Sequence, residues 1–267
     1  MKIYFLTYGD NKFYLSKKHI TSLAKKSNYF DYVIDMGPKD LDVEFRNKYS
    51  NIFLQQRGGG FWIWKHHIIS NLLDKISEGD VVVYCDAGAS INLSDHAKKR
   101  FDDYIKLLKD SQFSNLRMQC EEGFIEKNYT YKELFDYFNI YTDSQFGNSL
   151  QLQAGHMFFK KNNDSEDYFN QYRKILDENI ELITDSLNNK NQIDSFIENR
   201  HDQSIFSLLS KINGSEVIPN ETEFRTRKDI QYKYPFLSVR AYGHGPKDYL
   251  KYILNPKKFT KETIYFK

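Results

Sequence analysis

The sequence predicts an α/β fold in which a mostly parallel central sheet carries helices on both faces. Short runs of apolar, β-branched and aromatic residues, typical of buried strands, occupy residues 2–7, 32–35 and 81–85. Segments with apolar residues at spacings of three and four, typical of helices, lie between these runs. Strands that alternate with helices favour a parallel sheet that is covered on both sides.

The elements follow in order along the chain. In the first part, KIYFLT ends at a turn, a surface helix is expected after it, YVID forms a second strand and Gly37-Pro38 breaks the chain. The helices expected before the third strand cover residues 14–26, 39–48 and 61–77. In the second part, we expect helices at 95–110, 131–139, 165–185 and 202–211, and strands at 114–119, 151–159, 215–218 and 236–241. Residues 139–149 and 186–195 are rich in Asn and Asp and are expected to form loops.

Composition excludes several other classes of protein. The 38 Lys and Arg residues nearly balance the 36 Asp and Glu residues, so the chain lacks the positive charge of a nucleic-acid-binding protein. Its apolar runs are far shorter than the roughly 20 residues that span a bilayer, and the opening MKIYFLTYGDNKF turns polar too early for a signal peptide. Two cysteines, Cys85 and Cys120, predict no disulfide framework. We therefore expect a cytoplasmic protein without a transmembrane segment.

The strongest candidate site follows the third strand, in VVVYCDAGAS. Asp86 stands at the carboxyl end of this strand, where ligands bind in open α/β sheets, and the small residues Ala87 and Gly88 follow it. Small residues let a ligand approach the backbone, and the carboxylate can bind a hard cation or a ribose hydroxyl. The alternative is that Asp86 only ends the strand in a turn.

This segment resembles the Asp-x-Asp motif of glycosyltransferases with the GT-A fold, such as the YLDAD of glycogenin-like enzymes. A matching order of motifs runs along the chain as RGGGFWIWK, DVVVYCDAG, QAGHMFF and RHDQSIFSLL. The series is similar to that of bacterial and viral polysaccharide glycosyltransferases, some of which transfer galactofuranose. The resemblance extends from Tyr8 to His244 and implies a GT-A-like, Rossmann-like fold in a single domain, 1–267. Residues 1–92 would be its nucleotide-binding half and residues 93–267 its acceptor-binding half.

The resemblance also implies ligands for the matched positions. A nucleoside diphosphate sugar is expected to contact Thr7, Tyr8, Arg57, Gly60, Trp62, Lys65, Asp86, Ala87, Gly88 and Lys247. A glycan or glycolipid acceptor is expected to contact Gly155, His156 and His201. A divalent cation, Mn²⁺ or Mg²⁺, would be bound by Asp86 and His244. The sequence departs from the family here, because Gly88 replaces the second acid of Asp-x-Asp, which usually contacts the metal directly.

The stretch QQRGGGFWIWKHH places three glycines before both tryptophans of the chain. We expect the glycine turn to free N–H groups at the start of a helix, where a phosphate binds favourably. Arg57 and Lys65 would add positive charge for a diphosphate, and Trp62 would stack on a base or a sugar. Trp64 lies at helical spacing from Phe61 and Ile68 and is expected in the core.

Two segments hold candidate catalytic bases. Asp202 begins the helix predicted in NRHDQSIFSLL, and in an inverting reaction it would take the proton of the acceptor hydroxyl. Asp is also a preferred helix N-cap, which contributes about 1 kcal/mol, so both roles stay open. Glu122, together with Glu121 in QCEEGF, is a rival base, although adjacent acids on a surface loop are commonly just solvated.

The resemblance implies a nucleotide-sugar-dependent hexosyltransferase that acts in polysaccharide or glycoconjugate synthesis. The donor is expected to be UDP-linked, with UDP-galactofuranose as one candidate. The alternative is a non-catalytic carbohydrate- or nucleotide-binding protein with a degenerate metal site. A sugar-phosphate nucleotidyltransferase is disfavoured, because TYGDNKF has a single glycine where that class carries a glycine-rich basic loop.

Overall fold

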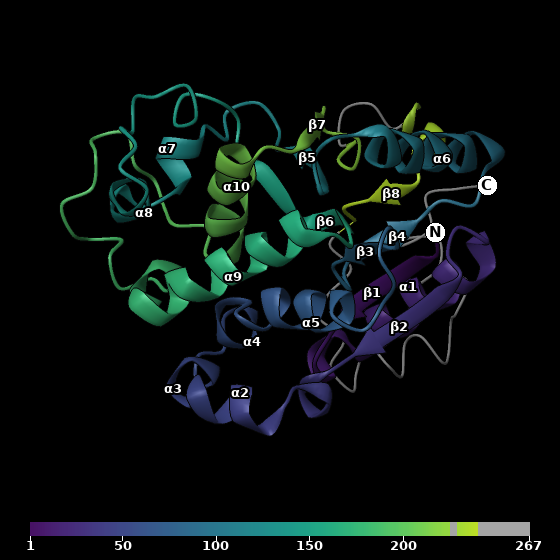
Figure 1. The fold of residues 1–267 in the computed structure, drawn as a ribbon, viewed down its shortest axis with the longest axis horizontal. Coiled ribbons are helices and arrows are strands. Elements are labelled where there is room, and N and C mark those ends of the chain that lie inside the picture. The colour runs from purple at the N-terminus through teal and green to yellow at the C-terminus, as the bar shows by residue number, and fades with distance from the viewer. Residues whose placement is uncertain (225–228, 240–267) are drawn as a thin grey trace.

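Six strands form the central sheet in the order β2-β1-β3-β6-β5-β7 (Figure 1). They are β1 (Ile3–Tyr8), β2 (Tyr32–Met36), β3 (Val81–Cys85), β5 (Asn115–Gln119), β6 (Leu152–Lys160) and β7 (Glu216–Ile218). The computed structural model describes residues 1–224 and 229–239, so the predicted site residues His244 and Lys247 lie outside the described residues. A second sheet pairs β4 (Ser90–Ile91) with β8 (Phe236–Leu237).

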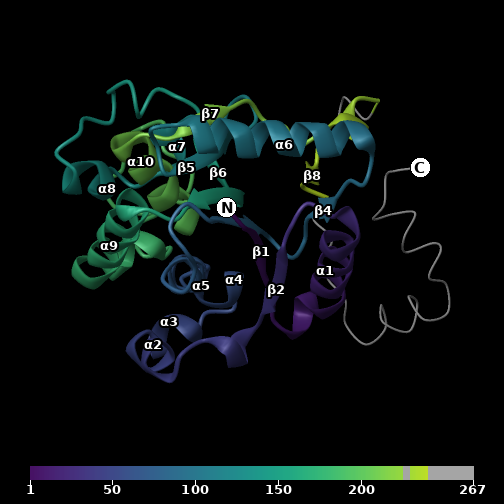
Figure 2. The same cartoon turned by 45° about the vertical axis from the view of Figure 1, so that its right-hand side comes forward.

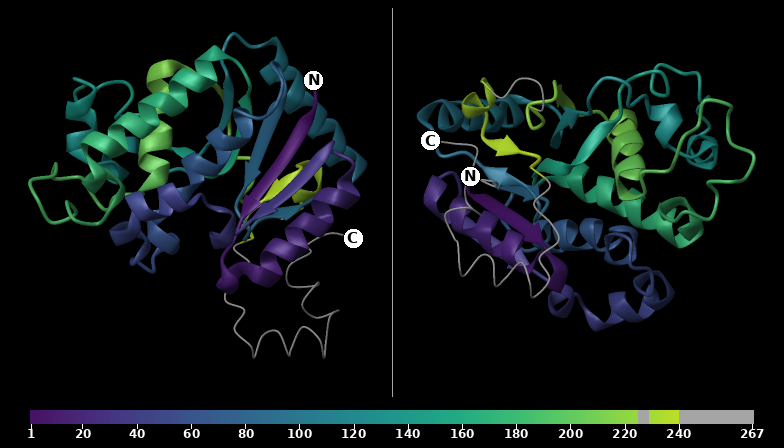
Figure 3. Two further views of the ribbon diagram at one scale, coloured as in Figure 1. Left: turned by 60° about the horizontal axis from the view of Figure 1, so that its bottom comes forward. Right: turned by 180° about the vertical axis from the view of Figure 1, so that it is seen from behind.

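The helices cover both faces of the sheet. They are α1 (Tyr14–Ser27), α2 (Val43–Lys48), α3 (Ser50–Phe53), α4 (Gly58–Phe61), α5 (Trp64–Leu73), α6 (Asp95–Asp110), α7 (Glu126–Tyr129), α8 (Lys132–Tyr137), α9 (Asn163–Glu178) and α10 (Asp202–Asn213). Short 3₁₀ turns occupy Asn11–Phe13, Pro38–Asp40, Ile180–Ile183 and Gln231–Lys233. Figure 2 shows α1 and α5 on opposite sides of β1 and β2. In the left view of Figure 3, α1 and α6 lie to the right of the sheet, and α5, α9 and α10 lie to its left.

Each face of the sheet has its own apolar core. One cluster joins the sheet to α5, α9 and α10 through buried residues such as Ile68, Tyr172 and Phe206. The other joins it to α1 and α6 through residues such as Ile20 and Phe101. The near-continuous apolar run of β3 follows from this arrangement, because every one of its residues is buried between the two layers.

One strand opposes the rest. β6 pairs antiparallel with both β3 and β5, whereas the other strand pairs of the central sheet are parallel. The prediction of a mostly parallel α/β sheet is therefore confirmed, with β6 as the exception. The direction of β6 depends on how a long connection returns to the sheet, which the local apolar pattern does not record.

β6 also contains a bulge of several residues. Its register with β5 shifts between Arg117, which faces Met157, and Gln119, which faces Leu152. Residues 153–156 therefore lie opposite Met118 alone, and their peptide groups leave the regular ladder with β5. Bulges next to active sites re-aim side chains and free backbone groups for other partners. This bulge supplies the floor of the site described below.

The predicted elements agree closely with the structure, and α6 has the predicted bounds of 95–110. Three helices differ at their ends. The segment 39–48 divides into a 3₁₀ turn and α2, the segment 165–185 divides at the end of α9, and the helix expected from residue 61 begins at Trp64. β4, α3 and α7 were not predicted, because each has only two to four residues. Among the described residues, no helix combines the length and apolar character that crossing a membrane requires.

Candidate functional site

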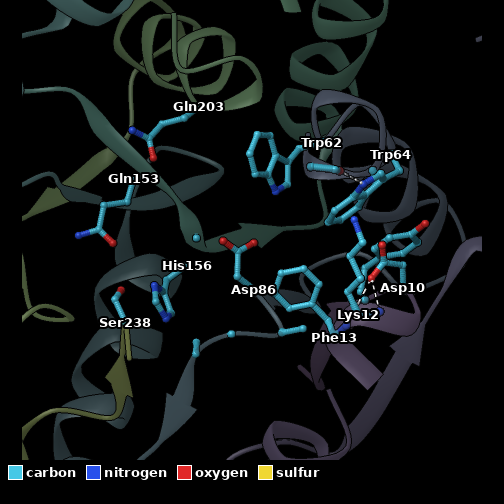
Figure 4. A pocket seen from close by; sticks show the side chains of 18 of the residues that line it. Asp10, Lys12, Phe13, Trp62, Trp64, Asp86, Gln153, His156, Gln203 and Ser238 are labelled. Atoms are coloured by element: carbon cyan, nitrogen blue, oxygen red, sulfur yellow. Dashed lines mark hydrogen bonds between the residues drawn. The ribbon is translucent and has the colours of Figure 1, made fainter. Parts of the chain in front are cut away.

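A pocket of about 650 Å³ opens at the carboxyl ends of β1 and β3, beside the bulge of β6 (Figure 4). Tyr8 and Gly9 reach it from the end of β1, and Asp86 with Ala87 and Gly88 reach it from the end of β3. Its other walls come from the glycine tract, the bulge and the segment before α10. This is the position at which open α/β sheets bind their ligands.

Three charged side chains from separate parts of the chain meet beneath the pocket. Lys65 Nζ lies 2.6 Å from Asp202 Oδ2 and 3.4 Å from Asp86 Oδ1. The side chains of Lys65 and Asp202 are 3% and 5% exposed, whereas that of Asp86 is 43% exposed. The cluster therefore presents the carboxylate of Asp86 to a ligand and shields Lys65 and Asp202 from solvent.

The bulge of β6 fixes this cluster through backbone groups. Lys65 Nζ donates to the carbonyl of Ala154 at 3.1 Å, and the N–H of Asp86 donates to the carbonyl of Gly155 at 2.9 Å. Tyr84 Oη donates to Asp86 Oδ1 at 2.7 Å and sets the orientation of the carboxylate. A Cβ at position 155 would lie 3.2 Å from Asp86 Oδ2, so glycine permits the close approach of the two strands.

Burial and neighbouring charges shift the pKa values of Lys65 and Asp202. Burial raises the pKa of Asp202 to about 6, from an ordinary value of 3.8, because the carboxylate has lost its hydration; the charge of Lys65 opposes this effect and that of Asp86 adds to it. Burial alone would lower the pKa of Lys65, but the two carboxylates outweigh it and the pKa lies above its ordinary value. A carboxylate with a pKa near 6 is suited to exchange a proton at neutral pH.

Asp202 is the first residue of α10, and His201 stands at the N-cap without a side-chain cap bond. The carboxylate is thus turned toward Lys65, in the first turn of a helix, where the helix dipole favours negative charge. The structure describes this ion pair and leaves the predicted catalytic role of Asp202 a prediction.

The glycine tract forms a left-handed turn. Residues 58–62 all have positive φ: 60°, 58° and 94° at Gly58, Gly59 and Gly60, 52° at Phe61 and 57° at Trp62. Non-glycine residues rarely adopt this region, and such strain is concentrated at functional sites. The segment labelled α4 in Figure 1 is this turn.

The turn explains why loose backbone lies beside bulky side chains. A Cβ at Gly58 would lie 2.3 Å from the ring of Trp62, so the glycine makes room for the indole, which points into the pocket (Figure 4). Trp64 Nε1 donates to the carbonyl of Gly58 at 3.0 Å, and its ring stacks on Tyr8 with centroids 3.9 Å apart. Trp64 is buried as expected, yet one part of it lines the pocket.

The N–H groups of Gly59 and Gly60 do not form the expected anion cradle. The N–H groups of Gly59 and Gly60 donate to the carbonyls of Gln56 and Gln55, and the next two N–H groups also donate within the turn. They are therefore not available to a phosphate. The left-handed conformation consumes the donors that a right-handed helix start would expose.

Several other predicted residues lie away from the pocket wall. Arg57 is half-exposed and pairs with Asp185 and Glu198. His201 is buried, pairs with Asp185 and stacks on Phe61. Thr7 and Gly60 are buried behind the wall, and Glu122 is exposed, whereas its neighbour Glu121 lines the pocket. The predicted ligand contacts of these residues are not tested by their positions.

Sequence reasoning missed several pocket residues. On the β1 side they are Asp10, Lys12 and Phe13, and on the side of β6 and α10 they are Phe124, Gln153, Arg200, Gln203 and Ser238. Two signals could have revealed some of them. TYGDNKF follows the first strand directly, and Gln203 follows Asp202 in the quoted motif. Gln203 Oε1 accepts from the N–H of Ala154 at 3.2 Å, so it too is anchored on the bulge.

The described residues fit a divalent cation only in part. Asp86 Oδ1 is engaged by Tyr84 and Lys65, which leaves Oδ2 for a metal, and positions 87 and 88 carry no ligating group. Within residues 1–224 and 229–239, no group of three His, Cys, Asp or Glu side chains could hold a metal ion. A cation at Asp86 would need most of its ligands from a bound diphosphate or from elsewhere in the chain.

No protein-family model and no curated protein sequence matches the chain. Solved structures do match it. The chain is similar to a glycosyltransferase involved in the glycosylation of the major capsid of PBCV-1, with 11% identity and a TM-score of 0.52 over 95% of this chain and 100% of that one. An active-site mutant of LgtC matches with 12% identity and a TM-score of 0.44 over 91% and 88% of the two chains. The chain has a GT-A-like glycosyltransferase fold.

The fold that the sequence predicted is thereby confirmed. In this GT-A-like fold the Lys65–Asp86–Asp202 cluster lies at the carboxyl ends of β1 and β3, next to the residues that line the pocket. A shared fold does not determine chemistry, so activity has to be argued from this cluster and its pocket.

Proposed function

We propose that this protein is a glycosyltransferase that moves a sugar from a nucleoside diphosphate donor to the hydroxyl of a glycan acceptor. The observation that carries the proposal is the Lys65–Asp86–Asp202 cluster, in which the half-exposed carboxylate of Asp86 lines the pocket and the buried Asp202, with a pKa of about 6, lies beneath it. A pair of carboxylates in different environments is a common arrangement for divided catalytic roles.

The two ends of the pocket suit two substrates. Near β1, the Tyr8–Trp64 stack lies close to Asp10, Lys12 and Phe13, which together offer an aromatic surface and polar groups for a nucleotide. Beyond Asp86, the wall changes to Glu121, Phe124, Arg200 and Gln203, which can bind sugar hydroxyls through charged and amide groups and a sugar face through a ring. The donor sugar would lie between them, over Asp86 and Gly155.

In this proposal the acceptor hydroxyl attacks the anomeric carbon with inversion. The new C–O bond forms as the bond to the diphosphate breaks, the diphosphate leaves with the electron pair, and Asp202 takes the hydroxyl proton. Lys65 holds Asp202 in place and stabilises its charge before the proton arrives. Glu121, which lines the pocket, and Glu122 are the rival bases.

A divalent cation, Mn²⁺ or Mg²⁺, would neutralise charge on the leaving diphosphate when bound. Asp86 is the ligand that the described residues offer it, and we propose His244 as another. Because Asp86 contributes a single free oxygen, we expect the cation to bind tightly only together with the diphosphate. Titration of Mn²⁺ into the protein with and without UDP, followed by calorimetry, checks this linkage.

We propose a UDP-linked donor, on the resemblance to polysaccharide glycosyltransferases, with UDP-galactofuranose as one candidate. Thermal unfolding with UDP, GDP, CDP and their sugars, with and without Mn²⁺, tests it. A ligand at about 100 times its Kd adds roughly 2.7 kcal/mol of stability. A shift that Asp86→Ala abolishes supports the proposal, and a flat panel on folded protein refutes it.

One observation favours a second candidate, a non-catalytic carbohydrate- or nucleotide-binding protein. Gly88 stands where the family has a second acid, so the metal site is incomplete among the described residues. This candidate predicts that donor sugars bind but are neither hydrolysed nor transferred, and that Asp202→Asn leaves both properties unchanged. Release of UDP from the bound donor, measured over hours at high enzyme concentration, separates the two.

A further inference from the structure

His156 is a buried imidazole on the wall of the pocket. It belongs to the bulge of β6, directly after Gly155, and faces Cys85 in the register of β3 and β6. The residue is 1% exposed, yet it lines the pocket. Figure 4 shows the ring beside Asp86, Gln153 and Ser238. A residue of a central strand thus reaches the pocket wall.

Neither ring nitrogen of His156 has a hydrogen-bond partner among the described residues. Buried polar groups are nearly always paired, because an unpaired one loses its hydration without compensation. Phe236 packs against the ring with centroids 5.7 Å apart and restricts its orientation. A leucine or phenylalanine would fill this space without an unpaired polar group, so the nitrogens point to a partner that enters the pocket.

The buried surroundings of His156 favour the neutral form of the ring. Burial lowers the pKa of His156 to about 4; the charge of Asp86 opposes the effect and that of Lys65 adds to it. A neutral imidazole carries one N–H donor and one acceptor nitrogen. A sugar hydroxyl can bind at either nitrogen, because it accepts from the N–H and donates to the bare nitrogen, whereas an ionised phosphate oxygen can only accept.

The polar neighbours of His156 are already paired with one another. Thr222 Oγ1 donates to Gln153 Oε1 at 3.0 Å, and Ser238 Oγ donates to Thr222 Oγ1 at 3.2 Å. Gln153 Nε2 donates to the carbonyl of Gln119 at 2.9 Å. The described part of the chain thus surrounds His156 with polar groups that are already paired, and it gives the imidazole no hydrogen-bond partner.

We propose that His156 recognises a hydroxyl group of a bound sugar and so determines which sugar the pocket accepts. The inference rests on the proposed glycosyltransferase function and extends it. The hydroxyl belongs either to the donor sugar or to the acceptor, since the pocket wall at His156 adjoins both Asp86 and the Gln153 side. His156 contacts substrate in this role and moves no proton.

The test compares His156→Leu and His156→Gln with the wild type, and His66→Leu serves as the matched control. His66 is equally buried, has a pKa lowered to about 3 and an unpaired Nδ1, but stacks on Tyr172 in the core away from the pocket. Thermal unfolding is measured for each protein alone, with UDP, and with UDP-galactose, UDP-glucose and UDP-galactofuranose. Initial rates with simple glycosides as acceptors complete the set.

Four results are expected. His156→Leu raises the unfolding midpoint of the ligand-free protein by about 2–4 °C, because it removes unpaired buried nitrogens. It binds UDP as the wild type does. It weakens recognition of one sugar roughly 3- to 10-fold, the effect of one lost hydrogen bond, whereas His156→Gln retains most of that recognition. The pH profile of the rate keeps its shape, because this role involves no proton transfer.

The arms of the experiment distinguish the two sugars. If the hydroxyl belongs to the donor sugar, His156→Leu reduces the extra stability that a UDP-sugar gives over UDP. If it belongs to the acceptor, His156→Leu raises the KM for the glycoside and leaves the KM for the donor unchanged. The proposal is overturned if His156→Leu lowers stability as His66→Leu does. It is also overturned if His156→Leu binds every sugar as the wild type does. A wild type that binds no nucleotide at all overturns the proposed function, and this inference with it.

Discussion

Alanine at position 58 would place a methyl group 2.3 Å from the six-membered ring of Trp62. Contacts under 3.0 Å cannot persist, so Trp62 has to move out of the place in which it points into the pocket. The backbone adds a second penalty, because φ is 60° at this position. A non-glycine residue in the left-handed region costs roughly 1–2 kcal/mol. We expect Gly58→Ala to lose that stability and also to bind the donor more weakly.

Two matched substitutions separate these effects. Gly79 has a φ of 80° and no atom within 4 Å of the place that an added methyl group would take, and Gly59 has a φ of 58° with its nearest such atom 3.8 Å away. Gly79→Ala and Gly59→Ala should therefore carry the backbone penalty of about 1–2 kcal/mol alone. Urea unfolding measures the three losses in stability, which should be similar unless Trp62 finds no new position.

Tryptophan fluorescence then reports the displacement, because Trp62 and Trp64 are the two tryptophans of the sequence. The emission of Gly58→Ala should differ from that of the wild type, whereas Gly79→Ala should leave it unchanged. UDP-sugar binding should weaken in Gly58→Ala and stay unchanged in Gly79→Ala. Wild-type emission and wild-type affinity in a folded Gly58→Ala protein would refute the reasoning that the glycine exists to seat Trp62.

Three further predictions concern charged residues. With a pKa of about 6, Asp202 can act as a base above that pH, so kcat/KM should fall as the pH drops below 6. Asp202→Asn should lower the rate roughly 10²- to 10⁴-fold and remove this limb of the pH profile. A wild-type rate in Asp202→Asn would exclude Asp202 as the base. Lys65→Met leaves two carboxylates without their cation and should cost about 3–5 kcal/mol at pH 7. The cost should be smaller at pH 5, where Asp202 is protonated, and urea unfolding at the two pH values measures the difference; equal costs would contradict it. Arg57→Ala removes half-exposed pairs with Asp185 and Glu198 and should change stability by less than about 1 kcal/mol, and less again in 1 M salt, while its donor KM tests the predicted diphosphate contact.

Local patterns were sufficient to predict most elements of the fold. The run VVVYC and the periodicity of 95–110 are local properties, and both were located correctly. The left-handed turn was not predicted, since Phe61, Trp64 and Ile68 keep helical spacing whether or not the first of them lies in a helix. Its conformation is determined by how Trp62 and Trp64 pack on the glycine backbone, which is a tertiary effect.

The site could be predicted as separate candidates but not as an arrangement. Asp86, Lys65 and Asp202 were each identified, yet nothing local indicates that one ammonium group lies between the two carboxylates. Arg57 and Lys65 were treated alike because both are basic and near the glycines, and burial separates them: Lys65 is enclosed with its acids, and Arg57 lies at the surface. Gln153 went unrecognised because an isolated amide carries no spacing signal.

The bulge of β6 separates what anchors the site from what the ligand meets. Lys65 and Arg117 donate to the carbonyls of Ala154 and Gln153, and Gln203 accepts from the N–H of Ala154, so three distant elements are held by peptide groups that every amino acid possesses. Side chains at 153 and 156 can therefore be exchanged during divergence while these anchors persist. One or two base changes in the gene can therefore alter the pocket wall at these positions while Lys65, Arg117 and Gln203 keep their backbone anchors.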